Sequence, residues 1–226
     1  MAQLFAPCEL DWMEHYPDPV ERAADKWVHL VGLALAAAGG FYLFYASFIG
    51  GDIGKATAVA LYAACMISML AASTAYNLSN VCPARPLLRR ADEAGIFLMI
   101  AGSYTPFTVL VLDGWWSVGM TTLVWTVALA GVVGKMVLPP LSEKVWTAIY
   151  AGFGWLAVVM IQPLIEGVGP ETLVLIAAGG LIYTVGVLFF LNHKLRFRRA
   201  VWHTFVVTAA AIHYVAVMSA VGLRPF

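Results

Sequence analysis

Seven long apolar runs constrain the fold of this 226-residue chain more than any other feature of its sequence. A helix needs about 20 apolar residues to cross the roughly 30 Å of hydrocarbon in a bilayer. Each run is close to that length, and only short polar segments separate the runs. The predicted spans are Trp27 to Ile49, Thr57 to Tyr76, Ala94 to Leu112, Trp115 to Val137, Val145 to Ile165, Thr172 to Leu191 and Ala200 to Leu223.

The composition agrees with a membrane protein, because 62% of the residues are hydrophobic and only 12% are charged. Soluble domains carry about 25% charged residues. Backbone polar groups cannot remain unpaired in lipid, so each run is a helix unless the chain forms a barrel of short alternating strands. The sequence shows no such alternation. It therefore predicts an all-α integral membrane protein, a seven-transmembrane helix bundle.

Lysine and arginine residues predict the orientation, because they are retained on the cytoplasmic side of a membrane. With the N-terminus inside, all of them except Lys55 and Arg224 fall in cytoplasmic connections. We therefore expect a cytoplasmic N-terminal segment at 1–26, a transmembrane domain at 27–223 and an outside tail at 224–226. The first 25 residues lack the features of a signal peptide and are expected to be retained. The plasma membrane is the expected location.

Charge and cysteine content exclude some functions. The formal net charge is zero, so no basic surface suggests nucleic acid as a partner, and membrane lipids are the expected partners. The three cysteines, Cys8, Cys65 and Cys82, form no C-x-x-C pair. They indicate neither a disulfide framework nor a cysteine zinc site, and Cys65 is expected to be a packing residue buried in the membrane.

Polar residues gather at the predicted cytoplasmic ends of the spans. Ionisable residues are costly within a membrane, so they are candidates for a functional site. His213, ten residues beyond His203 and about 15 Å further along the helix, is the deepest of them. The residues expected at a shared depth are His29, Ser73, Asn77, Asp92, Glu93, Arg199 and His203.

These residues also have interpretations without chemistry. Asp92 could cap the third helix, and Asn77 could be the polar end of the second. Arg199 could set the topology and contact anionic lipid. The histidines of the first and seventh spans could be interfacial or could pack through a hydrogen bond.

Four ordered segments resemble the hemolysin III family, the bacterial relatives of the progestin and adiponectin receptors. The resemblance runs from about Glu21 to Val217. The segments are Glu21 with His29 and Gly32, then Ser73 to Asn77, then Asp92 to Pro106, and finally Trp202 to Val206 with His213 and Tyr214.

The resemblance implies a seven-helix bundle with a zinc site near its cytoplasmic face. It extends to the alkaline ceramidases and so suggests hydrolysis of a lipid amide. In the family pattern one histidine ends helix 2, two histidines four residues apart open helix 7, and an aspartate at the start of helix 3 holds the metal-bound water. On this pattern Asp92 and Ser73 are the candidate catalytic residues, and Asp92 and His203 are the candidate metal ligands.

The sequence departs from the pattern at two of the three histidines. Asn77 stands where the histidine of helix 2 is expected, and Arg199 stands where the first histidine of helix 7 is expected. A guanidinium has no lone pair to give a metal, and an amide oxygen is a poor zinc ligand beside imidazole. The usual three-histidine site is therefore incomplete.

Two hypotheses address this departure. In the first, Arg199 pairs with Asp92 and occupies electrostatically the position of a metal. In the second, zinc is held by a rebuilt site of Asp92, His203 and either His29 or His193. The first requires no metal, whereas the second does.

Several functions follow from these hypotheses. The leading one is membrane or lipid homeostasis, or lipid sensing, with a degenerate zinc site. The alternative is a zinc-dependent hydrolase of a lipid amide, and a pore-forming cytolysin ranks below both. A retinal protein is excluded because the seventh span has no lysine. The candidate ligand-binding residues are His29, Asn77, Arg199, His203 and His213.

Overall fold

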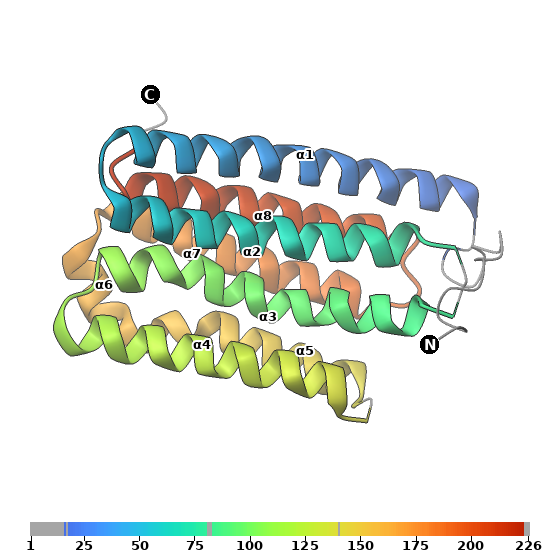
Figure 1. The fold of residues 1–226 in the computed structure, drawn as a ribbon. Coiled ribbons are helices and arrows are strands. Elements are labelled where there is room, and N and C mark those ends of the chain that lie inside the picture. Colours follow the sequence, from blue (N-terminus) through green and yellow to red (C-terminus); the bar gives the residue numbers. More distant parts are fainter. Residues whose placement is uncertain (1–15, 17, 81–82, 140, 224–226) are drawn as a thin grey trace.

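The computed structural model describes residues 16, 18–80, 83–139 and 141–223, and Figure 1 shows them as a single bundle of helices. Every regular element in this part of the chain is a helix. The elements are α1 (Pro19–Ile49), α2 (Ile53–Leu78), α3 (Arg85–Leu110), α4 (Gly114–Val137), α5 (Glu143–Gly154), η2 (Trp155–Met160), α6 (Ile161–Gly167), α7 (Pro170–Phe190) and α8 (Arg198–Ala220).

Within the described residues, seven helical segments are long and apolar enough to cross a membrane. Six are single helices, and the fifth span, Glu143–Gly167, combines α5, η2 and α6. The prediction of an all-α bundle with seven spans is therefore confirmed. The chain is a multi-pass membrane protein. Cys8, Cys82 and the tail at 224–226 lie outside the described residues.

Two helices begin well before the predicted spans. Helix α1 starts at Pro19, where the side chain of Asp18 caps it by accepting a hydrogen bond from the backbone of Glu21. Helix α3 starts at Arg85, so Asp92 lies inside the helix, and the prediction that Asp92 caps it is wrong. Hydropathy detects only the apolar part of a span, and these polar turns extend the helices beyond it.

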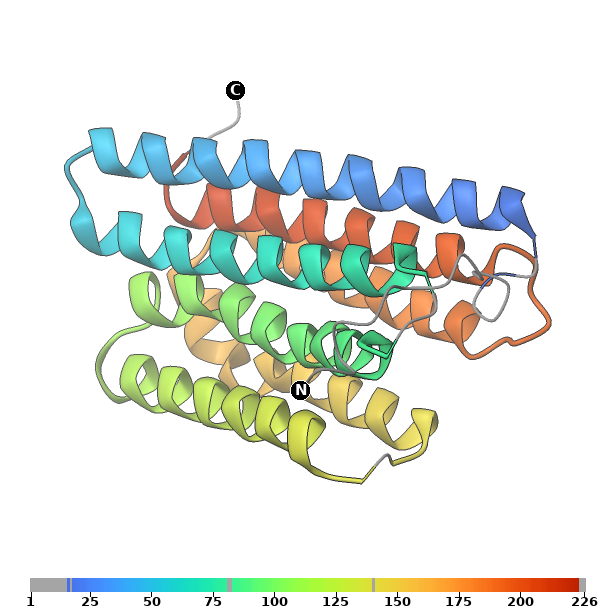
Figure 2. The ribbon, with the colours of Figure 1, turned by 45° about the vertical axis from the view of Figure 1, so that its right-hand side comes forward.

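The helices are arranged so that the last span returns beside the first. Helix α1 packs between α2 and α8, and α3 packs between α2 and α4. Figures 1 and 2 both place α1 and α4 at opposite edges of the bundle. We call the end at which α1, α3 and α8 begin and α2 ends the site end; it lies on the right in Figure 1.

The fifth span is interrupted, and a tyrosine from α3 compensates for the interruption. The Tyr104 hydroxyl donates to the Gly154 carbonyl at 2.8 Å and accepts from the Ala157 amide at 2.6 Å. These backbone groups lie where α5 gives way to η2. Irregular backbone at membrane depth is tolerated where protein groups satisfy it, as they do here.

Glycines allow close approach between helices. A Cβ atom placed on Gly102 of α3 would lie 2.5 Å from the Cβ atom of Cys65 on α2. Cys65 is buried in this contact, as expected from the sequence. Close packing through small residues is the usual way in which membrane helices associate.

We expect Gly102→Ala to destabilise the protein by about 1–3 kcal/mol, because the added methyl group meets a Cβ atom fixed to its backbone. The control is Gly152→Ala, since no atom lies within 4 Å of a Cβ placed there. Thermal unfolding of both variants in one detergent tests this. Equal melting temperatures for the two would contradict the packing described for α2 and α3.

Candidate metal centre

Three side chains from the first and last spans converge at the site end. Asp25 and His29 are one turn apart on α1, and His203 comes from α8. One candidate ligand atom of each lies within 4.8 Å of the other two. His203 Nδ1 is 2.7 Å from Asp25 Oδ1, and His29 Nδ1 is 3.6 Å from the same oxygen. We call these three residues the α1–α8 cluster.

The cluster is enclosed by protein. Asp25 is 0% exposed and His29 is 2% exposed, while His203 is also buried. The two imidazole rings meet edge to face with their centroids 4.3 Å apart. A buried carboxylate requires partners for its oxygens, and the structure supplies them.

Tyr16 completes the surroundings of the carboxylate. Its hydroxyl donates a hydrogen bond to Asp25 Oδ2 at 2.5 Å, and its side chain is buried. Burial and the neighbouring Asp25 charge raise the pKa of Tyr16 well above its ordinary value. The phenol is therefore neutral and donates, and both oxygens of Asp25 have a partner.

A chain of hydrogen bonds connects three other predicted residues to the cluster. Arg199 donates to Asn77 Oδ1 at 3.3 Å, and Asn77 Nδ2 donates to Ser73 Oγ at 3.2 Å. Ser73 Oγ is 3.3 Å from His29 Nε2, and His29 Nδ1 is 2.8 Å from the Asp25 carbonyl. Because a carbonyl only accepts, Nδ1 of a neutral His29 carries the proton and Nε2 keeps its lone pair.

Asp92 of α3 lies near this network but not in an ion pair with Arg199. Its carboxylate is close enough to His203 and Arg199 to interact with their charges. Among the ion pairs of the described residues, none within 4.0 Å joins Arg199 to Asp92. The two head groups therefore form no direct ion pair, which counts against the hypothesis, and the guanidinium donates to the Asn77 amide.

The carboxylate that joins the two histidines also differs from the predicted one. The rebuilt zinc site was expected to combine Asp92 with His203 and either His29 or His193. In the described part of the chain, the group of converging donors contains His29 and His203, but its carboxylate is that of Asp25. Asp92 is left beside the cluster, on a different helix from its three donors.

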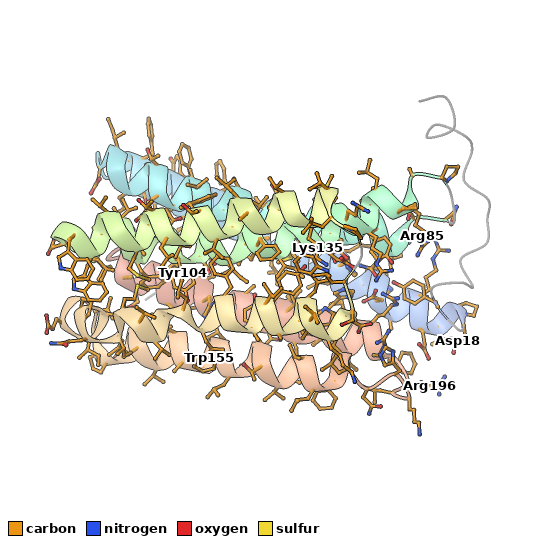
Figure 3. The ribbon with its side chains drawn as sticks, turned by 90° about the horizontal axis from the view of Figure 1, so that it is seen from below. Asp18, Arg85, Tyr104, Lys135, Trp155 and Arg196 are labelled. Carbon is orange, nitrogen blue, oxygen red and sulfur yellow. The ribbon has the colours of Figure 1, made fainter. Side chains whose placement is uncertain are left out.

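The residue after Asp92 fixes the start of α3 against its neighbours. Glu93 forms an ion pair with Lys135 of α4, and its carbonyl accepts a hydrogen bond from Tyr150 of α5. In Figure 3, Lys135 is nearer the site end than Tyr104 is. These contacts hold the turn that carries Asp92.

Two other histidines lie away from the cluster. His213 Nε2 is 3.2 Å from the Ile176 carbonyl, and its ring packs against Gly179 of α7. The interpretation of His213 as a packing residue fits this placement. His193 is exposed, with Nδ1 3.0 Å from the Arg198 guanidinium. The predicted residues that do come together at the site end are His29, Ser73, Asn77, Asp92, Arg199 and His203.

Sequence reasoning missed Asp25 and Tyr16. Asp25 precedes His29 by four residues, a spacing that places both side chains on one helix face. The signal was therefore present, but the predicted first span began at Trp27 and assigned Asp25 to the N-terminal segment. Tyr16 lies outside every helix, and no periodicity indicates its position.

The donor set of the α1–α8 cluster fits a transition metal ion. Two imidazoles and one carboxylate are ligands that zinc and related first-row ions accept. The Tyr16 hydroxyl donates to Asp25 Oδ2, and the Asp25 carbonyl accepts from His29 Nδ1, as partners of metal ligands commonly do. Such ligands bind in their deprotonated forms, so metal binding would release the proton that Asp25 and His203 share.

The fold and the cluster together define a class, a multi-pass helical membrane protein with a candidate metal centre at one end. Residues 21–214 match the family model described as "Haemolysin-III related". The chain belongs to this family, and the resemblance inferred from the sequence is confirmed.

The relatives include bacterial and mammalian proteins. The chain is 31% identical to "Hemolysin-3" of Bacillus cereus over 88% of this chain and 90% of that protein. It is 26% identical to "Hemolysin-3 homolog" of Bacillus subtilis, covering 88% and 93% respectively. It is 27% identical to the human "Monocyte to macrophage differentiation factor", covering 89% and 84%. The similarity spans nearly the whole bundle in each case.

We expect Tyr16→Phe to lower the free energy of unfolding by about 1.5–3 kcal/mol, because it removes a hydrogen bond to a buried charged group. Tyr42→Phe is the matched control, since Tyr42 is 47% exposed. Thermal unfolding at neutral pH measures both. If the two variants melt together, Tyr16 does not support Asp25 as described.

Proposed function

We propose that the protein is a metal-dependent hydrolase of the plasma membrane that cleaves an amide bond in a membrane lipid. The observation that carries this proposal is the convergence of Asp25, His29 and His203 on one buried point. The excess of basic residues in the connections on that side supports a cytoplasmic position for the site.

The residues of the site have separate roles in this proposal. The α1–α8 cluster holds the cation, and the Asp25 carbonyl orients His29 by accepting a hydrogen bond from its Nδ1. A bound transition metal supplies Lewis acidity, which activates water and polarises a carbonyl. Asp92 is placed on a neighbouring helix to accept the proton that the attacking water loses, the ordinary task of a general base.

A membrane lipid is the substrate class that suits this position. The cluster lies at one end of spans that are otherwise apolar, so the head group and the first part of an acyl chain are at its depth. Resemblance to the ceramidases supports an amide as the scissile bond. Sensing or homeostasis of lipids would follow from turnover of such a molecule.

A second function, metal-free lipid sensing, is favoured by the contact between Arg199 and Asn77. These two residues occupy positions at which the family pattern has histidines, and they hydrogen-bond to each other. The site therefore contains a fixed positive charge where a metal ligand is expected. In this alternative Arg199, Asn77 and His203 bind an anionic head group without hydrolysis.

Metal content separates the two functions. We expect about one zinc or similar ion per chain of purified protein, because three donors of the right kind converge. Asp25→Ala, His29→Ala and His203→Ala should each lose it, measured by elemental mass spectrometry. His193→Ala is the control, since that histidine is exposed and outside the cluster. Protein without metal, or with metal that the cluster variants retain, would contradict a centre at this position.

Asp92→Asn should separate binding from chemistry. We expect the variant to keep its metal and to lose hydrolysis of a fluorescent ceramide by about 100-fold or more, the usual contribution of a general base. Asp113→Asn, on an exposed residue at the start of α4, is the control. Unchanged turnover in Asp92→Asn would exclude the assigned role.

A further inference from the structure

A groove lies between α1 and α8, on the helical turns that carry the cluster. It has a volume of about 330 Å³ and mainly apolar walls. This volume is near the lower end of the roughly 300–1,000 Å³ of ligand pockets, so it suits part of a lipid rather than a whole one. Its walls include Ala24 and Val28 of α1, Phe197 at the N-cap of α8, and Ala200, Val201 and Thr204 of α8.

The groove and the cluster share the same helical turns. Ala24 directly precedes Asp25, and Thr204 directly follows His203. Consecutive helix residues point about 100° apart, so the groove lies on the side of α1 and α8 next to the cluster. Because the cluster is buried, a substrate needs a route to it. The groove lies along the line of contact between α1 and α8, the two helices that carry the cluster.

Further along the bundle the same joint is closed. A Cβ atom placed on Gly32 would lie 2.6 Å from Cγ2 of Val207, which shows how closely the helices approach there. Still further along, the Tyr214 hydroxyl donates to the Gly39 carbonyl at 3.0 Å. The groove between α1 and α8 therefore belongs to the site end.

Phe197, which lines the groove, has a strained backbone conformation. It has φ 58° and ψ 22°, and in the described part of the chain no other residue except glycine has a positive φ. The left-handed conformation is an outlier for a bulky side chain. Such strain concentrates at ligand clamps and switch regions. Here the strained residue lines the groove at the start of α8.

We propose that this groove binds the first part of one acyl chain of a membrane lipid, next to its head group, and so places the linkage beside the α1–α8 cluster. The inference deepens the proposed function and rests on it for the identity of the linkage. The rest of the chain would lie along the exposed apolar faces of α1 and α8. Apolar walls, a limited length and continuity with the bilayer all fit this occupant.

Photo-crosslinking tests the proposal. The full chain is reconstituted in phosphatidylcholine vesicles with a ceramide that carries a diazirine near the amide carbonyl, and labelled residues are mapped by mass spectrometry. We expect labelling to concentrate around Val28, Val201 and Thr204. Thr204→Trp should reduce it about fivefold or more, because the indole fills the groove.

The matched control is Thr208→Trp, an exposed residue one turn along the same helix and outside the groove. It should leave the labelling unchanged. Val28→Trp fills the groove from α1 and serves if Thr204→Trp fails to fold. Labelling spread evenly over exposed faces such as Val174 and Leu181 of α7, or equal labelling in Thr204→Trp and Thr208→Trp, would overturn the proposal.

This experiment does not depend on metal, so it separates two failures. Labelling of the groove in protein that contains no metal would support the lipid site and count against the hydrolase. Metal bound at the cluster without labelling of the groove would overturn the lipid site and leave the hydrolase standing.

Discussion

The buried carboxylate of Asp25 is the interaction on which the site end depends. Removing a charge from water is costly, and the cost is recovered only if partners satisfy the charge. Tyr16 and His203 do so from outside α1, while His29 lies one turn along it. Those partners tie Tyr16, the first helix and the last helix to one point. His29 also contacts Ser73 of α2, which accepts a hydrogen bond from Asn77 of the same helix, so α2 is joined to this point as well.

The three charged side chains nearest the α1–α8 cluster, Asp25, Asp92 and Arg199, do not balance one another. Asp25 and Asp92 carry two negative charges when ionised, and Arg199 provides one positive charge. Among these groups one negative charge remains if both histidines are neutral. A proton on His203 or a metal ion at the α1–α8 cluster would compensate for it. Arg199 therefore supplies part of the charge that a metal alone would supply in the three-histidine pattern, and Asp25 adds a carboxylate donor to the site.

Hydropathy was sufficient to predict the seven spans, because an apolar run in lipid has few alternatives to a helix. It was insufficient for the polar turns before Trp27 and Ala94, which are helical and carry Asp25 and Asp92. Arg199 donates a hydrogen bond to Asn77. This pairing depends on tertiary geometry, and the depth of the two residues in the membrane does not determine it. Tyr16 was missed because a single residue outside a helix leaves no periodic signal.

The cluster joins the first and last spans, so it depends on the folding of the whole bundle. Asp25 and His203 are separated by 178 residues, yet their side chains are 2.7 Å apart. Contacts between distant parts of a chain stabilise the fold only after the chain has lost the entropy of loop closure. The cluster can therefore form only when α8 has returned beside α1. A centre built in this way exists only in the closed bundle, so the geometry of the site and the closure of the fold are maintained by the same contacts.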